Sequence, residues 1–224
     1  MPDAADSARR KEDRLAPLVN PSTSAVLVQE MQHGVVGTGS GLPALAEVGA
    51  SISLIDQVTA VVKAARAAGV RVVHCTAENL PDEFGANRNA RVFVAARKAG
   101  MENAPGSESV RPVPQVGPEP GDVVLPRYHG LSPMTGTQLD SLLRNDGVTT
   151  VVVVGVSLNV AIPNLVFDAV NRSYQVVVVS DAVVGVPVEY GRQVLAHSLS
   201  LVATLASTDE VVEAWTTIGS NAVD

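Results

Sequence analysis

The chain of 224 residues has little of what typifies secreted, membrane-spanning or nucleic-acid-binding proteins. Its single cysteine, Cys75, excludes an intramolecular disulfide and suits a reducing compartment. No run approaches the roughly 18 apolar residues of a membrane span, and the charged first 20 residues lack the apolar core of a signal peptide. The net charge of −7 argues against nucleic acid. We therefore expect a cytoplasmic protein with a small-molecule partner, and neither nucleic acid nor a membrane.

Aromatic residues make up only 3% of the chain, whereas 46% of it is hydrophobic, so the core must consist mainly of valine, alanine and leucine. A chain of this length can bury one such core. We expect residues 1–20 to form a tail or arm and residues 21–224 to form a single domain. The glycine-rich stretch 34–49 is expected to be a lid or interface loop.

The order of apolar segments predicts a doubly wound α/β fold. Apolar, β-branched runs such as Thr149–Val154 are typical of parallel strands that are covered on both faces. We predict a three-layer α-β-α domain whose six-stranded, mostly parallel sheet has the order 3-2-1-4-5-6. The expected strands are 24–29, 70–75, 122–125, 149–154, 174–180 and 202–206. The expected helices are 52–68, 90–98, 135–144, one from about 161, 189–199, and one capped at 207 or 208.

The ends of three strands are expected to meet in one crevice. Ligands of such sheets bind at the carboxyl ends of the strands, beside helix N-termini. The first strand ends at Glu30, the third runs into Arg127, and the turn 155–161 follows the fourth. No glycine-rich phosphate fingerprint follows the first strand, so a dinucleotide is not expected.

Three stretches of the chain resemble the isochorismatase-like hydrolases, a superfamily that includes nicotinamidases and other cysteine amidohydrolases. The resemblance covers about residues 20–217. The stretches are AVLVQEMQ (25–32), RYHGLSPMTGTQLDSLL (127–143) and VVVVGVSLNVAIPNLVFDAVNRSYQVVVVSDA (151–182). The last is the most specific, because it reproduces strand, turn, helix and strand.

The resemblance implies a catalytic triad whose three positions are all substituted. The amidohydrolase branch uses an aspartate after the first strand, a lysine after the third and a cysteine that opens the helix after the fourth. The matching positions here are Glu30, Arg127 and Ala161. Glu30 keeps a carboxylate, Arg127 keeps a charge but cannot donate its proton usefully at neutral pH, and Ala161 has no nucleophile. Cys75 cannot replace it, because that residue belongs to the second strand.

The resemblance also implies backbone features of the site. These are a cis peptide at Val156–Ser157 and an oxyanion hole formed by the N–H groups of Ser157 and Ala161. Further candidate substrate contacts are polar residues near the same strand ends or in a loop expected to face the crevice; they are Gln32, Asn87, Arg88 and His129.

A mechanism without a thiol remains open. Isochorismatase itself lacks the cysteine and hydrolyses an enol ether by protonating the vinyl group. In that scheme Glu30 is the acid and Arg127 binds the substrate carboxylate. An ion pair between the two residues would favour the ionised carboxylate and oppose this role. His129 is a further candidate base.

The leading prediction is a hydrolase that acts on a small carboxylated or carbonyl-bearing metabolite without a cysteine nucleophile. The alternative is a catalytically inactive member that binds a small molecule or serves as an assembly subunit. A regulatory protein-binding module is the weakest of the three interpretations. Members of the superfamily often form dimers or larger assemblies, so a homo-oligomer, either a dimer or a tetramer, is expected.

A metal centre is the weaker interpretation of the histidines. His33, His74 and His129 all fall near predicted strand ends, where a three-histidine site is conceivable. Nicotinamidases carry a metal-binding Asp-x-His…His pattern after the second strand, but the corresponding loop here, 78–91, has no histidine. We therefore expect neither a metal nor another cofactor.

Overall fold

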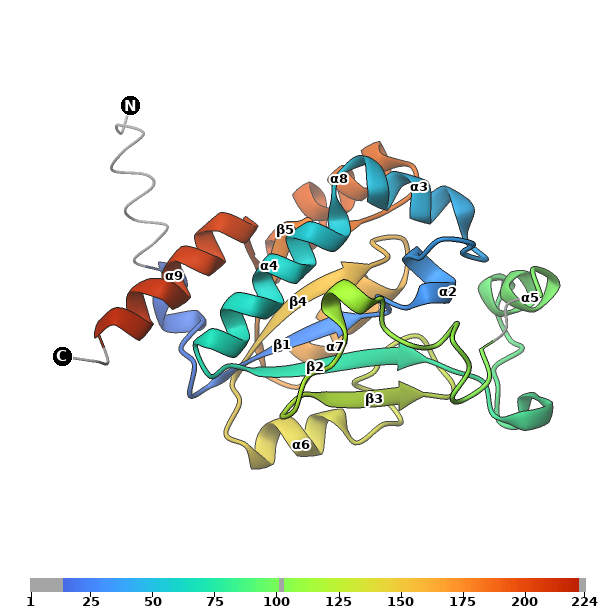
Figure 1. Ribbon diagram of the computed structural model, residues 1–224, viewed down its shortest axis with the longest axis horizontal. Helices are drawn as coiled ribbons and strands as arrows, with labels where there is room; N and C mark the ends of the chain where they lie inside the picture. Colours follow the sequence, from blue (N-terminus) through green and yellow to red (C-terminus); the bar gives the residue numbers. More distant parts are fainter. Residues whose placement is uncertain (1–13, 101–102, 222–224) are drawn as a thin grey trace.

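The protein is a three-layer α-β-α structure built around one six-stranded parallel sheet (Figure 1). The computed structural model describes residues 14–100 and 103–221. The strand order is β3-β2-β1-β4-β5-β6, which confirms the predicted topology. The strands are β1 (Ser24–Gln29), β2 (Arg71–Ala77), β3 (Val123–Arg127), β4 (Thr150–Val156), β5 (Gln175–Val184) and β6 (Thr204–Ala206).

Helices cover both faces of the sheet (Figure 1). They are α2 (His33–Val36), α3 (Pro43–Ser51), α4 (Leu54–Ala67), α5 (Arg91–Lys98), α6 (Leu139–Asn145), α7 (Ala161–Asn171), α8 (Val188–His197) and α9 (Thr208–Asn221). Short 3-10 helices lie at Pro81–Glu83, Pro114–Val116 and Leu199–Leu201. Within the described residues, no single helix is long and apolar enough to span a membrane; α3 and α4, bent by 69° at their junction, meet that criterion only as a pair.

The central strands are buried on both faces, as their sequence predicts. Every residue of β1 and of β4 is buried. Alternate side chains of β1 enter two separate cores, with Val26 and Val28 on one face and Ala25 and Leu27 on the other. The first core is closed by α4 and α9, and the second by α6, α7 and α8. Because the sheet lies between two cores, its polar strand ends become its functional edge.

The segment 34–49 is not the loop that its glycine content suggests. Most of it lies in α2 and α3, and its apolar side chains Val35, Val36 and Leu45 are buried in the first core. Pro43 stands at the start of α3, where the missing N–H costs little. The prediction of a loop is therefore wrong, because the buried valines and leucine of this segment favour packed helices despite the glycines between them.

Two predicted helices begin later than expected because the backbone is left-handed just before them. Ser53, at φ 53°, separates α3 from α4, so the helix predicted over 52–68 starts at Leu54. Gly136, at φ 74°, lies inside the helix predicted over 135–144, and α6 starts at Leu139. A right-handed helix cannot continue through either conformation.

The described chain packs onto the domain before the predicted boundary at residue 21. Residues 14–18 form a helical turn, and Leu15 and Val19 are buried in the first core. The indole nitrogen of Trp215 on α9 donates a hydrogen bond of 2.7 Å to the carbonyl of Val19. Residues 1–13 of the predicted tail lie outside the described residues.

Candidate functional site

A cavity of about 840 Å³ lies at the carboxyl ends of the central strands. The residues that line it at this edge are Glu30 after β1, Ala77 and Glu78 at the end of β2, Arg127 at the end of β3, and Ser157 after β4. The beginning of α3 and one side of α5 form its other walls. In Figure 1 the arrowheads of β2 and β3 point toward α5. Of the residues predicted for the site, the cavity brings together Glu30, Asn87, Arg127, His129, Ser157 and Ala161.

Glu30 is held in place through one carboxylate oxygen only. Its backbone is left-handed, with φ 51°. Its Oε1 accepts hydrogen bonds from Nε2 of Gln29 at 2.7 Å and from Nη2 of Arg127 at 2.6 Å. Within the described chain, Oε2 accepts no hydrogen bond. The side chain is 17% exposed, so this second oxygen remains available to a molecule in the cavity.

Arg127 is committed to the protein itself. Besides the contact with Glu30, its Nη1 donates to the carbonyl of Gly130 and, at 3.5 Å, to that of His129. Cys75 lies below this pair on β2 and is fully buried; burial raises the pKa of its thiol to about 12. Cys75 therefore remains a thiol at neutral pH and is no replacement nucleophile, as predicted.

The turn after β4 presents backbone donors at the cavity. The Val156–Ser157 peptide is cis, as the family resemblance implies. Asn159 ties the turn to the end of β5: its Nδ2 donates to the carbonyl of Val186 at 2.6 Å, and its Oδ1 accepts from the Val186 N–H at 2.8 Å. In the part of the chain that the structure describes, the N–H groups of Ser157 and Ala161 donate no hydrogen bond. Both residues line the cavity, and Ala161 opens α7.

Glycine is required where this turn approaches the first strand. Gly155 has φ 106°, and a Cβ there would lie 2.1 Å from the carbonyl oxygen of Gln29. The absence of a side chain lets the end of β4 lie directly against the end of β1. Glu30 and Ser157 are thereby brought to adjacent strand ends.

The other predicted contacts differ in where they lie. Asn87 lines the cavity and supports its wall, because its Oδ1 accepts a 2.7 Å hydrogen bond from the N–H of Gly130. His129 also lines it, with its ring packed so closely on Gly136 that a Cβ there would lie 2.2 Å from Cε1.

Gln32, Val156 and Arg88 do not line the cavity. Gln32 is buried and donates to the carbonyls of Ala77 and Val110, while Val156 is buried in β4. Arg88 is exposed and lies 4.0 Å from Glu83.

The three histidines lie in separate places. His33 begins α2, His129 lines the cavity, and His74 is buried in the middle of β2. No group of three or more histidine, cysteine, aspartate or glutamate side chains in the described ranges 14–100 and 103–221 is arranged to hold a metal ion.

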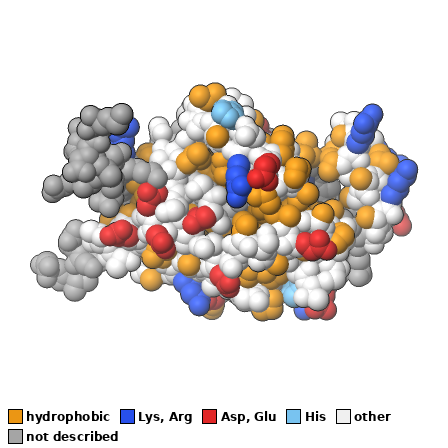
Figure 2. All heavy atoms as spheres, turned by 90° about the horizontal axis from the view of Figure 1, so that it is seen from above, with side chains coloured by type: hydrophobic (Ala, Val, Ile, Leu, Met, Phe, Trp, Pro, Cys, Tyr) orange, Lys and Arg blue, Asp and Glu red, His pale blue; other side chains and the backbone are white. Residues whose placement is uncertain are grey.

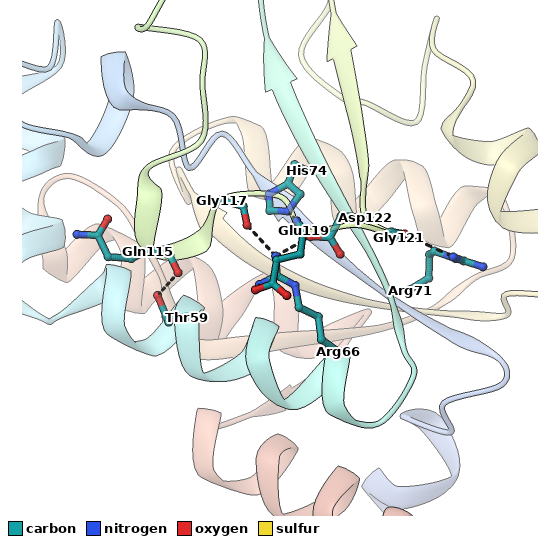
Figure 3. Close-up of polar contacts among 9 residues, drawn as sticks. All are labelled: Thr59, Arg66, Arg71, His74, Gln115, Gly117, Glu119, Gly121 and Asp122. Carbon is teal, nitrogen blue, oxygen red and sulfur yellow. Dashed lines mark hydrogen bonds and ion pairs between the residues drawn. The ribbon is translucent and has the colours of Figure 1, made fainter.

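His74 belongs to a polar cluster beside the sheet, shown in Figure 3. Oδ2 of Asp122, just before β3, lies 3.2 Å from Nε2 of His74 and accepts from Nη2 of Arg66 at 2.5 Å and from the N–H of Glu119 at 3.0 Å. Burial lowers the pKa of His74, against the opposing effect of Asp122. Burial also opposes the charge of Asp122, but the hydrogen bonds from Arg66, Glu119 and His74 outweigh it and hold its pKa below the usual value. None of these residues lines the cavity.

Two residues that contact Glu30 or line the cavity are absent from the predicted site. Gln29 contacts Glu30 directly, and Glu78 lines the cavity one residue after β2. A signal existed for each. Gln29 is the polar residue that ends the apolar strand SAVLVQ, and Glu78 follows a strand end just as Glu30 does.

The protein is a doubly wound α/β protein with a cavity at the carboxyl ends of its strands. Comparisons with known proteins agree with this class. The curated ureidoacrylate amidohydrolase RutB from a strain of Methylorubrum extorquens is 32% identical over 174 residues, covering 71% of this chain and 69% of that protein. A cysteine hydrolase from Pseudomonas syringae pv. phaseolicola 1448A has a similar structure, with a TM-score of 0.77, 22% identity, and coverage of 89% and 95% of the two chains. The nicotinamidase PncA from Bacillus subtilis also has a similar structure, with a TM-score of 0.69, 18% identity, and coverage of 83% of this chain and 99% of that one.

The isochorismatase domain model matches residues 24–210. The chain therefore belongs to the isochorismatase family.

Proposed function

We propose that this chain hydrolyses a small carbonyl-bearing metabolite, most simply an amide, with water activated by Glu30 and with no covalent intermediate. One observation carries the proposal: Glu30 lines the cavity, and only one of its two carboxylate oxygens accepts a hydrogen bond from the described residues. The names of the relatives support the amide, since ureidoacrylate amidohydrolase and nicotinamidase both act on amides. The proposal takes the matched triad positions to be substituted, by Glu30, Arg127 and Ala161. Because Ala161 offers no nucleophile, the attacking group must be water from the solvent.

The reaction needs one base and one site for negative charge. Glu30 Oε2 takes a proton from a water molecule as the water oxygen bonds to the substrate carbonyl carbon. The carbonyl oxygen then carries the negative charge, and the free N–H groups of Ser157 and Ala161 stabilise it. The carbon–nitrogen bond breaks as Glu30 returns the proton to the leaving nitrogen. A carboxylic acid and an amine or ammonia result.

The contacts of Arg127 argue against the vinyl-ether mechanism. That mechanism requires Arg127 to bind a substrate carboxylate, but Arg127 contacts Glu30 at 2.6 Å. Both of its terminal nitrogens are already engaged.

A second candidate is a catalytically inactive protein that binds a small molecule or acts as an assembly subunit. The methyl group of Ala161 favours it, because that residue opens the helix where the amidohydrolase branch has its thiol. Both candidates predict that Ala161→Cys alone restores no thiol-dependent amidase activity, since the new thiol would face an Arg127–Glu30 pair in place of lysine and aspartate. Iodoacetamide-sensitive ammonia release by that variant would contradict this.

The deciding experiment compares wild type with Glu30→Gln on ureidoacrylate, nicotinamide, other small amides and isochorismate, following ammonia and pyruvate. Glu189→Gln is the matched control, because it removes the same charge at an exposed position of α8 outside the cavity. Ammonia release that is lost only in Glu30→Gln supports the proposed mechanism. Pyruvate release lost in that variant would indicate the vinyl-ether mechanism instead. Silence on both products would favour the inactive binding protein.

We also propose that the chain self-associates. Val94 on α5 is 40% exposed and Phe84 is 77% exposed, and neither lines the cavity. Figure 2 shows hydrophobic side chains at the surface of this end of the molecule, among lysine and arginine. Exposed apolar groups that gather in one region are typical of contact surfaces. Light scattering at micromolar concentration should give the mass of a dimer or larger, and a monomeric mass would refute the proposal.

A further inference from the structure

The charges that line the cavity do not balance. Among the described residues, five charged side chains line it, and four of them form two pairs with each other. Glu30 contacts Arg127 at 2.6 Å, and Glu83 contacts Arg97 at 2.6 Å. The fifth is Glu78, which has no cationic partner among the described residues.

Each arginine that lines the cavity is already paired with a glutamate. Arg97 contacts Glu83 through two nitrogens, Nε to Oε1 at 2.9 Å and Nη2 to Oε2 at 2.6 Å. Nη1 of Arg127 donates to two backbone carbonyls, and its Nη2 contacts Glu30. A carboxylate that entered the cavity would compete with these glutamates for the arginines. It would also approach Glu78, and like charges at close range repel.

Glu78 keeps an acceptor for a ligand. Its N–H donates to the carbonyl of Arg127 at 3.0 Å, which places the residue beside the end of β3. Its Oε1 accepts a 2.9 Å hydrogen bond from Thr76 Oγ1, whereas no donor in the described chain reaches Oε2. The cavity-lining residues beside it, Asn79 and Asn103, are joined by a backbone hydrogen bond and carry no charge. This end of the cavity is therefore negative.

The remaining walls are largely apolar. From α5 and the residues after it come small and apolar side chains, and from the beginning of α3 come more of them. They are Val92, Phe93, Ala95, Ala96, Ala99, Leu42, Pro43, Ala44 and Leu45. A ligand with a hydrophobic body would bury apolar surface against them, which is favourable at about 25 cal/mol per Å².

We propose that the cavity selects a carbonyl compound with an apolar body and a cationic end, that Glu78 binds the cationic end, and that carboxylates are rejected. This rests on the proposed function for the position of the reacting carbonyl at Ser157 and Ala161. The backbones of β4 and β2 are two strand spacings apart, roughly 10 Å. A ring-sized body spans that distance once the reach of the Glu78 side chain is subtracted.

The test uses three matched probes that differ only in the charge opposite the amide: 4-(aminomethyl)benzamide, 4-methylbenzamide and 4-carbamoylbenzoate. Their binding to wild type, Glu78→Gln and Glu189→Gln is measured by isothermal titration calorimetry. Wild type should bind the ammonium probe about tenfold more tightly than the neutral one, the size expected for a hydrogen bond between charged groups. The carboxylate probe should bind most weakly.

Glu78→Gln should remove the preference for the ammonium probe, and Glu189→Gln should keep it. Equal affinities for the three probes, a preference for the carboxylate, no detectable binding of the ammonium probe, or a preference that survives in Glu78→Gln would each overturn the proposal. Binding is measured apart from turnover. If the probes bind in the expected order and no ammonia appears, the charge selection stands while the proposed hydrolase activity fails.

Discussion

The strand β3 has an arginine–carboxylate contact at each of its ends, and the two contacts differ in whether the carboxylate lines the cavity. Before the strand, Asp122 meets Arg66 at 2.5 Å, and after it Arg127 meets Glu30 at 2.6 Å. Asp122 does not line the cavity, and its Oδ2 accepts from Arg66, from the Glu119 N–H and from His74. Glu30 lines the cavity, and its Oε2 accepts no hydrogen bond from the described residues. Contact length thus does not distinguish the pair away from the cavity from the pair proposed to act in catalysis, and the proposal depends on an unused acceptor oxygen beside the cavity.

The largest effect we expect is a loss of activity when Glu30, the carboxylate that lines the cavity, is substituted. Glu30→Gln should lower kcat/KM by about 100- to 10,000-fold, because removal of a general base usually has that effect. Its free energy of unfolding should change little, since the glutamine amide can still contact Gln29 and since the site is open to water. Steady-state kinetics and urea denaturation on the same preparation measure both. A variant that keeps its activity would remove Glu30 from the mechanism.

The next largest effect we expect is a loss of stability when Asp122, the carboxylate away from the cavity, is substituted. Asp122→Ala should lower the free energy of unfolding by about 3 kcal/mol, because it leaves Arg66 and His74 without their shared partner. The activity of the folded fraction should be unchanged. Asp146→Ala is the control: its contact with Arg71 at 3.2 Å is half exposed and is worth at most about 1 kcal/mol. Urea denaturation measures the stability of both variants. Equal losses would contradict the distinction between the partly buried Asp122 cluster and the exposed pair of Asp146 and Arg71.

A smaller effect concerns the pH dependence of stability. Burial lowers the pKa of folded His74 below its usual 6.5, so the unfolded chain binds more protons as the pH falls through that value. Stability should therefore be complete above about pH 6.5 and decline below it, until the folded histidine also becomes protonated. Asp122, with its lowered pKa, adds a loss only below about pH 3.8.

His74→Gln should flatten the decline between pH 6.5 and 5. His197→Gln, at an exposed site of α8, should leave it intact. The midpoint of urea unfolding, measured at half-unit steps of pH, records the difference. The same slope in wild type and in His74→Gln would assign the decline to other groups.

The smallest effect is expected at Gln29. Its Nε2 donates to Glu30, and its Oε1 is buried with no partner among the described residues. Gln29→Leu removes a useful donor together with an unsatisfied acceptor, so the net change in stability should be within about 1 kcal/mol. Activity should fall by less than about tenfold, the effect of one lost hydrogen bond. A loss as large as that of Glu30→Gln would give Gln29 a much stronger positioning role.

The fold could be predicted because its signals are local. Unbroken β-branched runs mark buried strands, and their alternation with helical patterns fixes the layers and the strand order. The errors were also local: glycine content concealed the buried Val35, Val36 and Leu45 in the segment 34–49.

The site could be predicted only in part, because a side chain's partners come from distant segments. The strand-end rule located Glu30, Arg127 and the 155–161 turn. It also favoured Gln32, whose amide is used by carbonyls 45 and 78 residues away along the chain. No pattern around a single residue reports such partners. For the same reason the sequence left open whether Arg127 pairs with Glu30, and it gave no sign that Glu78 lacks a cationic partner among the described residues. These two facts shape the proposed selectivity.

The cavity is enclosed by walls of unequal strength. The sheet edge is fixed between two cores, whereas α5 buries none of its own side chains and contacts Glu83 through Arg97. A segment with so few buried contacts can separate from the rest at a small fraction of the global unfolding free energy. The groups proposed to react, at the strand ends, therefore keep their positions while α5 moves to admit a larger ligand. The upper size limit of a ligand then depends on how easily α5 is displaced.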